Sequence, residues 1–306
     1  FWRNGGYARI SGMMAGVTEK TYVCNSGTRD VMISCFDRDP DSVETVYIGV
    51  DEVKFDREKT APGQLYQELG LEEKQPVVLF ICRLHPQKRP FMMLEIAKKV
   101  QKQIPDVVFA VVGDGPQEEE LRKQAKYMKL ENTVRFLGAK QDVRPYYRDA
   151  KVTLVCSLKE GLSLTAYESC SMGVPVVSSD VGGQRDLVDN TTGALIPCLQ
   201  EEDSSLDSRV FPEEELKNFT DAIVHLLVDK DAWEAASRNC RERIETGFTI
   251  QKMVNRLAEE LIRVTRSPMR TNVRGARLSR ASVLCYPSCV GQGGTGNEGG
   301  CHPAQR

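Results

Sequence analysis

Two carboxylates stand eight residues apart in the stretch Glu160–Glu168, which follows an apolar run at 152–156 and leads into a predicted helix. Glu160 precedes this helix, and Glu168 lies about two turns inside it and about 80° away from Glu160 around the helix axis. The turn between them would direct several backbone N–H groups beyond the end of the strand. This pattern predicts a site for an anion beside hydroxyl groups and argues against a glycosidase-type pair of acid and base.

Cations or glycines follow three earlier apolar runs in the same way: Arg83 and Lys88 the first, Gly113-Asp114-Gly115 the second, and Gly138 the third. Because the carboxyl ends of parallel strands meet at one edge of a sheet, we expect these residues to converge on one crevice. Two cations with two carboxylates favour a phosphate group next to a hydroxyl-rich group. A dinucleotide fingerprint is excluded, since Glu118 stands where its third glycine belongs.

Apolar runs of strand length recur from residue 76 onwards, at 76–82, 107–112, 134–137, 152–156, 174–177 and 194–196. Stretches with helical spacing follow most of these runs, including one that Pro116 is expected to open. Surface helices are expected at 211–228, 232–246 and 250–264. This alternation predicts an α/β fold, a doubly wound, parallel Rossmann-like sheet with helices on both faces, over residues 64–265.

The first 56 residues contain a shorter α/β pattern, with helices at 7–17 and from an N-cap at Ser26, and strands at 21–25 and 42–50. We interpret 1–56 as the remnant of an N-terminal, acceptor-side Rossmann-like domain, since the chain begins at Phe1 without an initiator Met. Residues 57–63 are polar and contain Pro and Gly, which is typical of a linker. Residues 266–306 lose all periodicity and are predicted to be a disordered tail.

Composition is that of an ordinary globular protein, with 306 residues, 41% hydrophobic residues and a net charge of −2. The tail carries six arginines and one glutamate, so the preceding residues have a net charge of −7, which argues against a nucleic-acid partner. No apolar run is long enough for a membrane span. Most of the ten cysteines stand singly, which favours free thiols in a cytoplasmic protein.

Together, the motifs resemble the donor domain of retaining family-4 glycosyltransferases of the GT-B fold, over about residues 40–265. The matching motifs are Arg83-Leu84-x-x-x-Lys88, Val111–Pro116, Phe136-Leu137-Gly138, Glu160-x7-Glu168 and Gly173-x-Pro175-Val176-Val177. The resemblance implies two Rossmann domains, of which the second holds a nucleotide diphosphate sugar. It also implies sugar transfer to a glycan, lipid or other acceptor, without a metal or another cofactor.

The resemblance also implies a role for each matching residue. Arg83 and Lys88 would pair with the donor diphosphate, and Glu160 would bind sugar hydroxyls and favour positive charge at the anomeric carbon; these are the expected catalytic residues. The expected donor-binding residues are the backbone of Gly161, Leu162, Ser163 and Leu164 for phosphates and sugar, Glu168 for ribose, Leu137, Gly138 and Ala139 for the base, and Gly113 at the pocket edge.

Departures from the family pattern carry expectations of their own. Arg89 stands where a glycine often follows the lysine, so it is expected to add a third cation near the donor. Leu162 and Ser163 replace the common Phe-Gly, and Cys82 replaces a glycine. Nothing replaces the first domain's acceptor contacts, so residues 1–306 alone are expected to bind donor but to transfer sugar poorly.

Two alternative functions stay open: a nucleotide-sugar epimerase of GT-B fold, and a non-catalytic module that binds nucleotide sugars. The glycosyltransferase hypothesis places the protein in polysaccharide biosynthesis, in the cytoplasm or at the inner face of the plasma membrane, with a glycan or lipid-linked acceptor. His85 as a catalytic base and a zinc site in the tail at Cys285, Cys289, Cys301 and His302 are disfavoured, the latter because its spacing is irregular.

Overall fold

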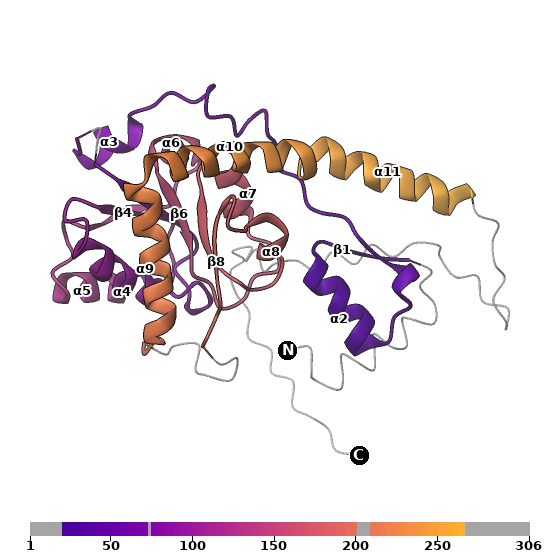
Figure 1. Ribbon diagram of the computed structural model, residues 1–306, viewed down its shortest axis with the longest axis horizontal. Helices are drawn as coiled ribbons and strands as arrows, with labels where there is room; N and C mark the ends of the chain where they lie inside the picture. The colour runs from indigo at the N-terminus through magenta and orange to yellow at the C-terminus, as the bar shows by residue number, and fades with distance from the viewer. Residues whose placement is uncertain (1–19, 73–74, 201–208, 267–306) are drawn as a thin grey trace, which may run out of the picture.

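The computed structural model describes residues 20–72, 75–200 and 209–266 and contains a six-stranded, all-parallel sheet (Figure 1). Its strands are β3 (Val77–Ile81), β4 (Val108–Val112), β5 (Val134–Gly138), β6 (Val152–Val155), β7 (Val176–Ser179) and β8 (Gly193–Ile196). Their order across the sheet is β5-β4-β3-β6-β7-β8. After β5 the chain returns to the other side of β3, so the switch point lies between β3 and β6. The predicted doubly wound sheet is confirmed.

Side chains of each strand alternate between two hydrophobic clusters, one on each face of the sheet. On β3, Val78 and Phe80 belong to the first cluster and Val77 and Leu79 to the second. The first is covered by α4 (Pro90–Gln101), α5 (Glu118–Tyr127) and α9 (Glu213–Val228). The second is covered by α3 (Gln64–Leu69), α6 (Arg144–Asp149), α7 (Leu164–Ser171), α8 (Gln184–Leu187) and much of α10 (Lys230–Gly247).

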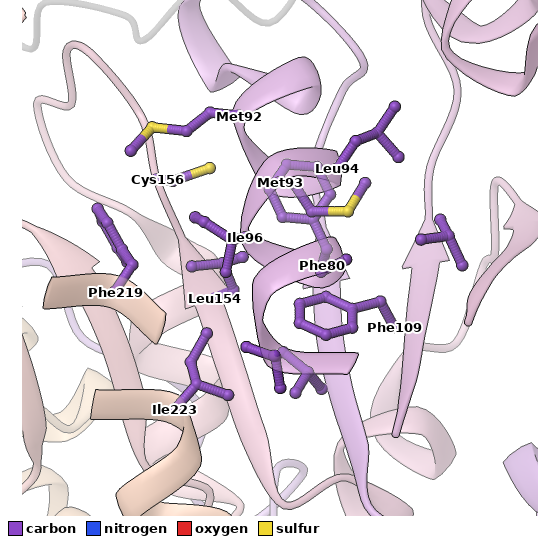
Figure 2. Packing of buried hydrophobic residues seen from close by; sticks show 14 of the residues in the cluster. Phe80, Met92, Met93, Leu94, Ile96, Phe109, Leu154, Cys156, Phe219 and Ile223 are labelled. Atoms are coloured by element: carbon purple, nitrogen blue, oxygen red, sulfur yellow. The ribbon is translucent and has the colours of Figure 1, made fainter. Parts of the chain in front are cut away.

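Helix α9 is part of the core rather than a surface element alone. Its buried residues include Leu216, Phe219, Ile223 and Leu226, which recur at helical spacing along one face. Figure 2 shows Phe219 and Ile223 in the first cluster together with Leu154 of β6. Full burial of each such side chain contributes about 1.5–3 kcal/mol, so α9 stabilises the side of the sheet that holds β6 to β8.

A small N-terminal unit contains β1 (Thr21–Val23), α2 (Ser26–Phe36), the 3₁₀ turn η1 (Pro40–Ser42) and β2 (Val43–Thr45). β1 and β2 pair in parallel. The expected N-cap at Ser26 is wrong: Asn25 caps α2, because its side-chain oxygen accepts a 2.7 Å hydrogen bond from the Thr28 amide. The expected strand at 42–50 is also longer than β2. The helix expected at 7–17 lies outside the described residues.

Helix α11 (Ile250–Arg266) runs from the large sheet back over the N-terminal unit, as Figure 1 shows. A parallel bridge joins Val50 to Thr249 at the helix start. Further along, the Tyr22 hydroxyl donates to Glu260 at 3.0 Å, and Arg256 pairs with Glu44. The first and last described segments of the chain therefore pack together.

The described cysteines are all free thiols, and Cys156, Cys170 and Cys240 among them are buried. Within the described ranges, no helix meets the length and hydropathy that crossing a bilayer requires. These ranges also contain no group of three or more His, Cys, Asp or Glu side chains that could hold a metal ion. The cysteines and histidine considered for a zinc site, and nearly all of the tail predicted at 266–306, lie outside the described residues.

Candidate functional site

The loops after β3 and β6 meet at the switch point of the sheet. The Gln87 side-chain amide donates to the Lys159 carbonyl at 2.7 Å, and the Leu158 amide donates to the Gln87 carbonyl at 2.8 Å. These bonds place Lys88 in direct ionic contact with Glu160, whose side chain is only 6% exposed, against 26% for Lys88. The structure therefore brings together two of the three predicted catalytic residues.

Lys88 is the last residue of a short 3₁₀ turn, η2 (Pro86–Lys88). His85 caps this turn, since its Nδ1 accepts from the Gln87 amide at 3.4 Å. Because its Nδ1 is used in this cap bond, His85 is a poor candidate for a catalytic base, a role that the sequence analysis also disfavoured. Arg83 lies exposed in the same loop, and no acidic partner pairs with it in the described part of the chain. Its predicted role stays a prediction.

Backbone N–H groups line the turn from Gly161 to the first residues of α7. Among the described residues, no hydrogen-bond acceptor is found for any amide from Gly161 to Thr165. Ser163 occupies the N-cap position without a side-chain cap bond. Unsatisfied amides at a helix start attract anions, because they add to the positive end of the helix dipole. The predicted donor-binding residues Gly161 to Leu164 therefore present unpaired donors beside Lys88 and Glu160.

Gly182 and Gly183, in the turn after β7, contact the backbone of Glu160 and Gly161. The sequence analysis did not predict this contact. Gly182 has φ +58°, and a Cβ there would lie 1.6 Å from the Glu160 carbonyl oxygen. The Gly183 amide donates to the Gly161 carbonyl at 3.3 Å. A Gly-Gly pair that follows a buried strand after two intervening residues is the signal that could have placed this turn at the same edge.

The glycines after β4 likewise allow close approach to another backbone segment, the start of the loop after β3. A Cβ on Gly113 (φ +123°) would lie 2.0 Å from the Cys82 carbonyl oxygen, and one on Gly115 (φ +157°) 2.4 Å from that of Leu84. The Gly113 amide donates to the Gly138 carbonyl at 2.9 Å. Close backbone approach therefore requires these glycines. Pro116 belongs to this turn, and α5 begins two residues later at Glu118.

The loop after β5 presents mainly main-chain groups. Leu137 and Gly138 are half-buried and Ala139 is exposed. The next residue, Lys140, is held in an ion pair with Glu68 at 2.5 Å. This loop therefore lies at the expected edge of the sheet, while its predicted contact with a base stays a prediction.

Glu168 is separate from the Lys88–Glu160 pair. Its Oε2 accepts a 3.0 Å hydrogen bond from the Tyr147 hydroxyl on α6, and the same hydroxyl lies 3.2 Å from the Thr165 carbonyl. Burial raises the pKa of Glu168, although the bond from Tyr147 and the charge of Lys54 act in the opposite direction. The two carboxylates of the Glu-x7-Glu motif thus have different environments, as their angular offset predicts.

Arg89 is not a third cation near the donor, and that expectation is wrong. Its side chain points into the interior, where it pairs with Glu215 of α9 at 2.6 Å, with side-chain exposures of 1% and 0%. It also donates to the Ser179 hydroxyl at 2.9 Å and to the Cys156 carbonyl. Arg89 therefore joins the start of α4 to the ends of β6 and β7.

Comparison with known proteins places this arrangement in a family. A model described as glycosyl transferases group 1 matches residues 64–242, more than half of the chain. The chain therefore belongs to the glycosyl transferases group 1 family. A crystal structure of Anabaena Alr3699/HepE in complex with UDP matches the fold with a TM-score of 0.72 and 20% identity, over 85% of this chain and 68% of that one. The GT-B fold predicted from the sequence is confirmed.

Among curated relatives, the chain is 30% identical over 257 residues to an Escherichia coli UDP-Gal:alpha-D-GlcNAc-diphosphoundecaprenol alpha-1,3-galactosyltransferase, covering 80% of this chain. It is 32% identical over 197 residues to a D-inositol 3-phosphate glycosyltransferase of Frankia alni, covering 60% of this chain. The matched parts span 60% and 47% of those two proteins, respectively.

Proposed function

We propose that this chain supplies the donor site of a retaining glycosyltransferase that uses a nucleotide diphosphate sugar and no metal. The contact between Lys88 and Glu160 at the switch point, beside the unpaired amides of Gly161–Thr165, is the observation that carries the proposal. It combines a cation, a carboxylate and a row of N–H donors. This is the set that a diphosphate attached to a sugar requires.

The chemistry follows from where charge develops during the reaction. The nucleoside diphosphate gains negative charge as the glycosidic bond breaks, and fixed donors aimed at it lower the barrier. Lys88 is partly exposed, so it can exchange its contact with Glu160 for one with a phosphate oxygen. Glu160 then binds sugar hydroxyls and stabilises positive charge at the anomeric carbon, and Arg83 supplies a second cation. Each charge-assisted hydrogen bond contributes about 1.5–3 kcal/mol.

Retention by front-face displacement is favoured because the nearby thiols make poor nucleophiles and the Glu160 carboxylate is paired with Lys88. Burial raises the pKa of the Cys82 thiol, and it raises the pKa of Cys156 to about 12. A thiol that stays protonated at neutral pH cannot readily form a glycosyl-enzyme. Departure of the diphosphate and attack by the acceptor on the same face require no such intermediate.

The acceptor and the location are part of the proposal. The name of the Escherichia coli relative contains a diphosphoundecaprenol acceptor and a UDP sugar, and the Anabaena structure contains UDP. For this protein we therefore place UDP sugars first among donors and a lipid-linked glycan first among acceptors. Work on such an acceptor would place the protein in the cytoplasm at the inner face of the membrane.

Thermal unfolding measured in the presence of UDP, GDP and ADP sugars tests whether the chain binds a donor. A donor at 100 times its Kd should raise the free energy of unfolding by about 2.7 kcal/mol. If no member of the panel stabilised the protein, the proposal would be refuted.

Incubation with donor but without an acceptor separates a glycosyltransferase from a nucleotide-sugar epimerase, since an epimerase would change the sugar configuration. Strong transfer by residues 1–306 alone would refute the expectation that this chain supplies mainly the donor site.

A further inference from the structure

Asn25 of the N-terminal unit reaches across to the turn that follows β6. Its side-chain nitrogen donates to the Gly161 carbonyl at 2.7 Å, while its side-chain oxygen accepts from the Thr28 amide at 2.7 Å. The residue is 1% exposed. Both ends of the Asn25 side-chain amide therefore have a hydrogen-bond partner, which fixes its orientation. If the amide were reversed, its NH₂ group would face the Thr28 N–H and its oxygen would face the Gly161 carbonyl oxygen.

The Gly161 carbonyl is held from two sides, by Asn25 and by the Gly183 amide at 3.3 Å. In a trans peptide the N–H group of the next residue points away from this carbonyl, and the described part of the chain contains no cis peptide bond. The Leu162 N–H is therefore directed away from Asn25 and Gly183. It has no acceptor among the described residues.

The Leu162 side chain is buried in the second cluster, whereas on the Gly161 side these two hydrogen bonds are the restraints found among the described residues. Gly161 is exposed, and a Cβ built on it would meet nothing within 4 Å. Glycine also rotates more freely than other residues. The direction of the Leu162 N–H thus depends on the partners of the Gly161 carbonyl.

We infer that Asn25 is a positioning residue, which orients the Gly161–Leu162 peptide so that the Leu162 N–H faces the diphosphate of the donor. The inference rests on the proposed function and deepens it. It also gives the N-terminal unit a role in donor binding, because docking of this unit supplies one of the two bonds to the Gly161 carbonyl.

The Asn25→Asp and Asn25→Ser variants test this role. Asp keeps the oxygen that caps α2 but loses the donor to Gly161, and Ser keeps a capping hydroxyl that is too short to reach across and adds no charge. We expect both variants to bind UDP, GDP or ADP about tenfold more weakly, measured by calorimetry. Binding of the matching nucleoside, which lacks phosphates, should keep its wild-type Kd.

Ser26→Ala is the matched control. Ser26 bonds to Asp186 through both its amide, at 2.8 Å, and its hydroxyl, so this variant weakens the same interface without touching Gly161. Its diphosphate affinity should equal that of the wild type. An equal loss in Ser26→Ala and Asn25→Ser, or unchanged diphosphate affinity in Asn25→Ser, would overturn the inference alone. A wild-type protein that binds no nucleotide would instead overturn the proposed function.

Discussion

Lys88 and Arg89 are neighbours in the chain, and each pairs with a glutamate, yet the two ion pairs have opposite surroundings. The Lys88–Glu160 pair lies at the sheet edge, and a quarter of the Lys88 side chain is exposed, 26%. The Arg89–Glu215 pair is sealed, with exposures of 1% and 0%. An accessible cation can exchange its partner for an incoming anion, whereas a sealed one cannot. Accessibility, and not charge alone, therefore separates Lys88, which we propose to bind the donor, from Arg89, which has a structural role.

The backbone reinforces this difference. Arg89 has φ +50°, a conformation in which a side chain is strained and glycine is favoured. The bonds of its guanidinium to Glu215, Ser179 and Cys156 keep it there. The buried pair thus fixes the backbone that immediately follows Lys88.

The largest effect should come from breaking the sealed pair. Arg89→Met leaves the Glu215 carboxylate buried and unpaired, which should lower the free energy of unfolding by about 3–5 kcal/mol. Chemical denaturation measures this change. The double variant Arg89→Met/Glu215→Met removes both charges and should regain most of the loss. If Arg89→Met were as stable as the wild type, the structural role of the buried Arg89–Glu215 pair would be contradicted.

At the open pair, activity should change more than stability. Glu160→Gln keeps the shape and an acceptor for Lys88 but removes the negative charge, so sugar transfer by the proposed glycosyltransferase should fall about 10²–10³-fold. Steady-state kinetics measure the loss. Glu213→Gln, at the exposed pair of Glu213 with Lys99, is the control and should leave the rate unchanged. Near-normal transfer by Glu160→Gln would reject its catalytic role.

Gly182→Ala tests the support beneath Glu160. The added methyl cannot fit against the Glu160 carbonyl, and the positive φ adds strain of about 1–3 kcal/mol. We expect a lower unfolding temperature together with weaker donor binding, because the backbone of Glu160 must shift. Gly247→Ala has open space around its Cβ and should have neither effect. Unchanged donor binding in Gly182→Ala would show that this turn does not hold the site.

The smallest effect concerns Glu168. Because burial raises its pKa, ionising Glu168 costs more in the folded protein than in the unfolded chain. Its contribution to stability is therefore complete at low pH and declines as the pH rises through the raised pKa. Glu168→Gln should remove this decline, and thermal unfolding from pH 4 to 8 measures it. A wild-type curve with no such decline, or a variant curve that keeps it, would contradict this assignment.

Much of the sheet could be predicted from the sequence because buried parallel strands are continuous apolar runs, as 76–82 and 107–112 are. The position of Glu160 and Lys88 at one edge followed from the same rule. The N-cap at Asn25 was harder, because Asn and Ser cap helices about equally well and stand side by side.

The direction of the Arg89 side chain could not be predicted. Its partner Glu215 lies 126 residues further along the chain, and only the packing of α9 brings the two together. Likewise, the Asn25 contact with Gly161 spans 136 residues. Sequence patterns describe neighbours along an element, whereas these contacts depend on how separate elements pack.

The return of α11 over the N-terminal unit also bears on how the protein is made. The Tyr22–Glu260 contact joins residues 238 positions apart. At about 5–20 residues per second, synthesis delays this contact by roughly 10–50 s. Until then β1 and β2 lack their contacts with α11, so a nascent chain exposes this short parallel pair to other chains.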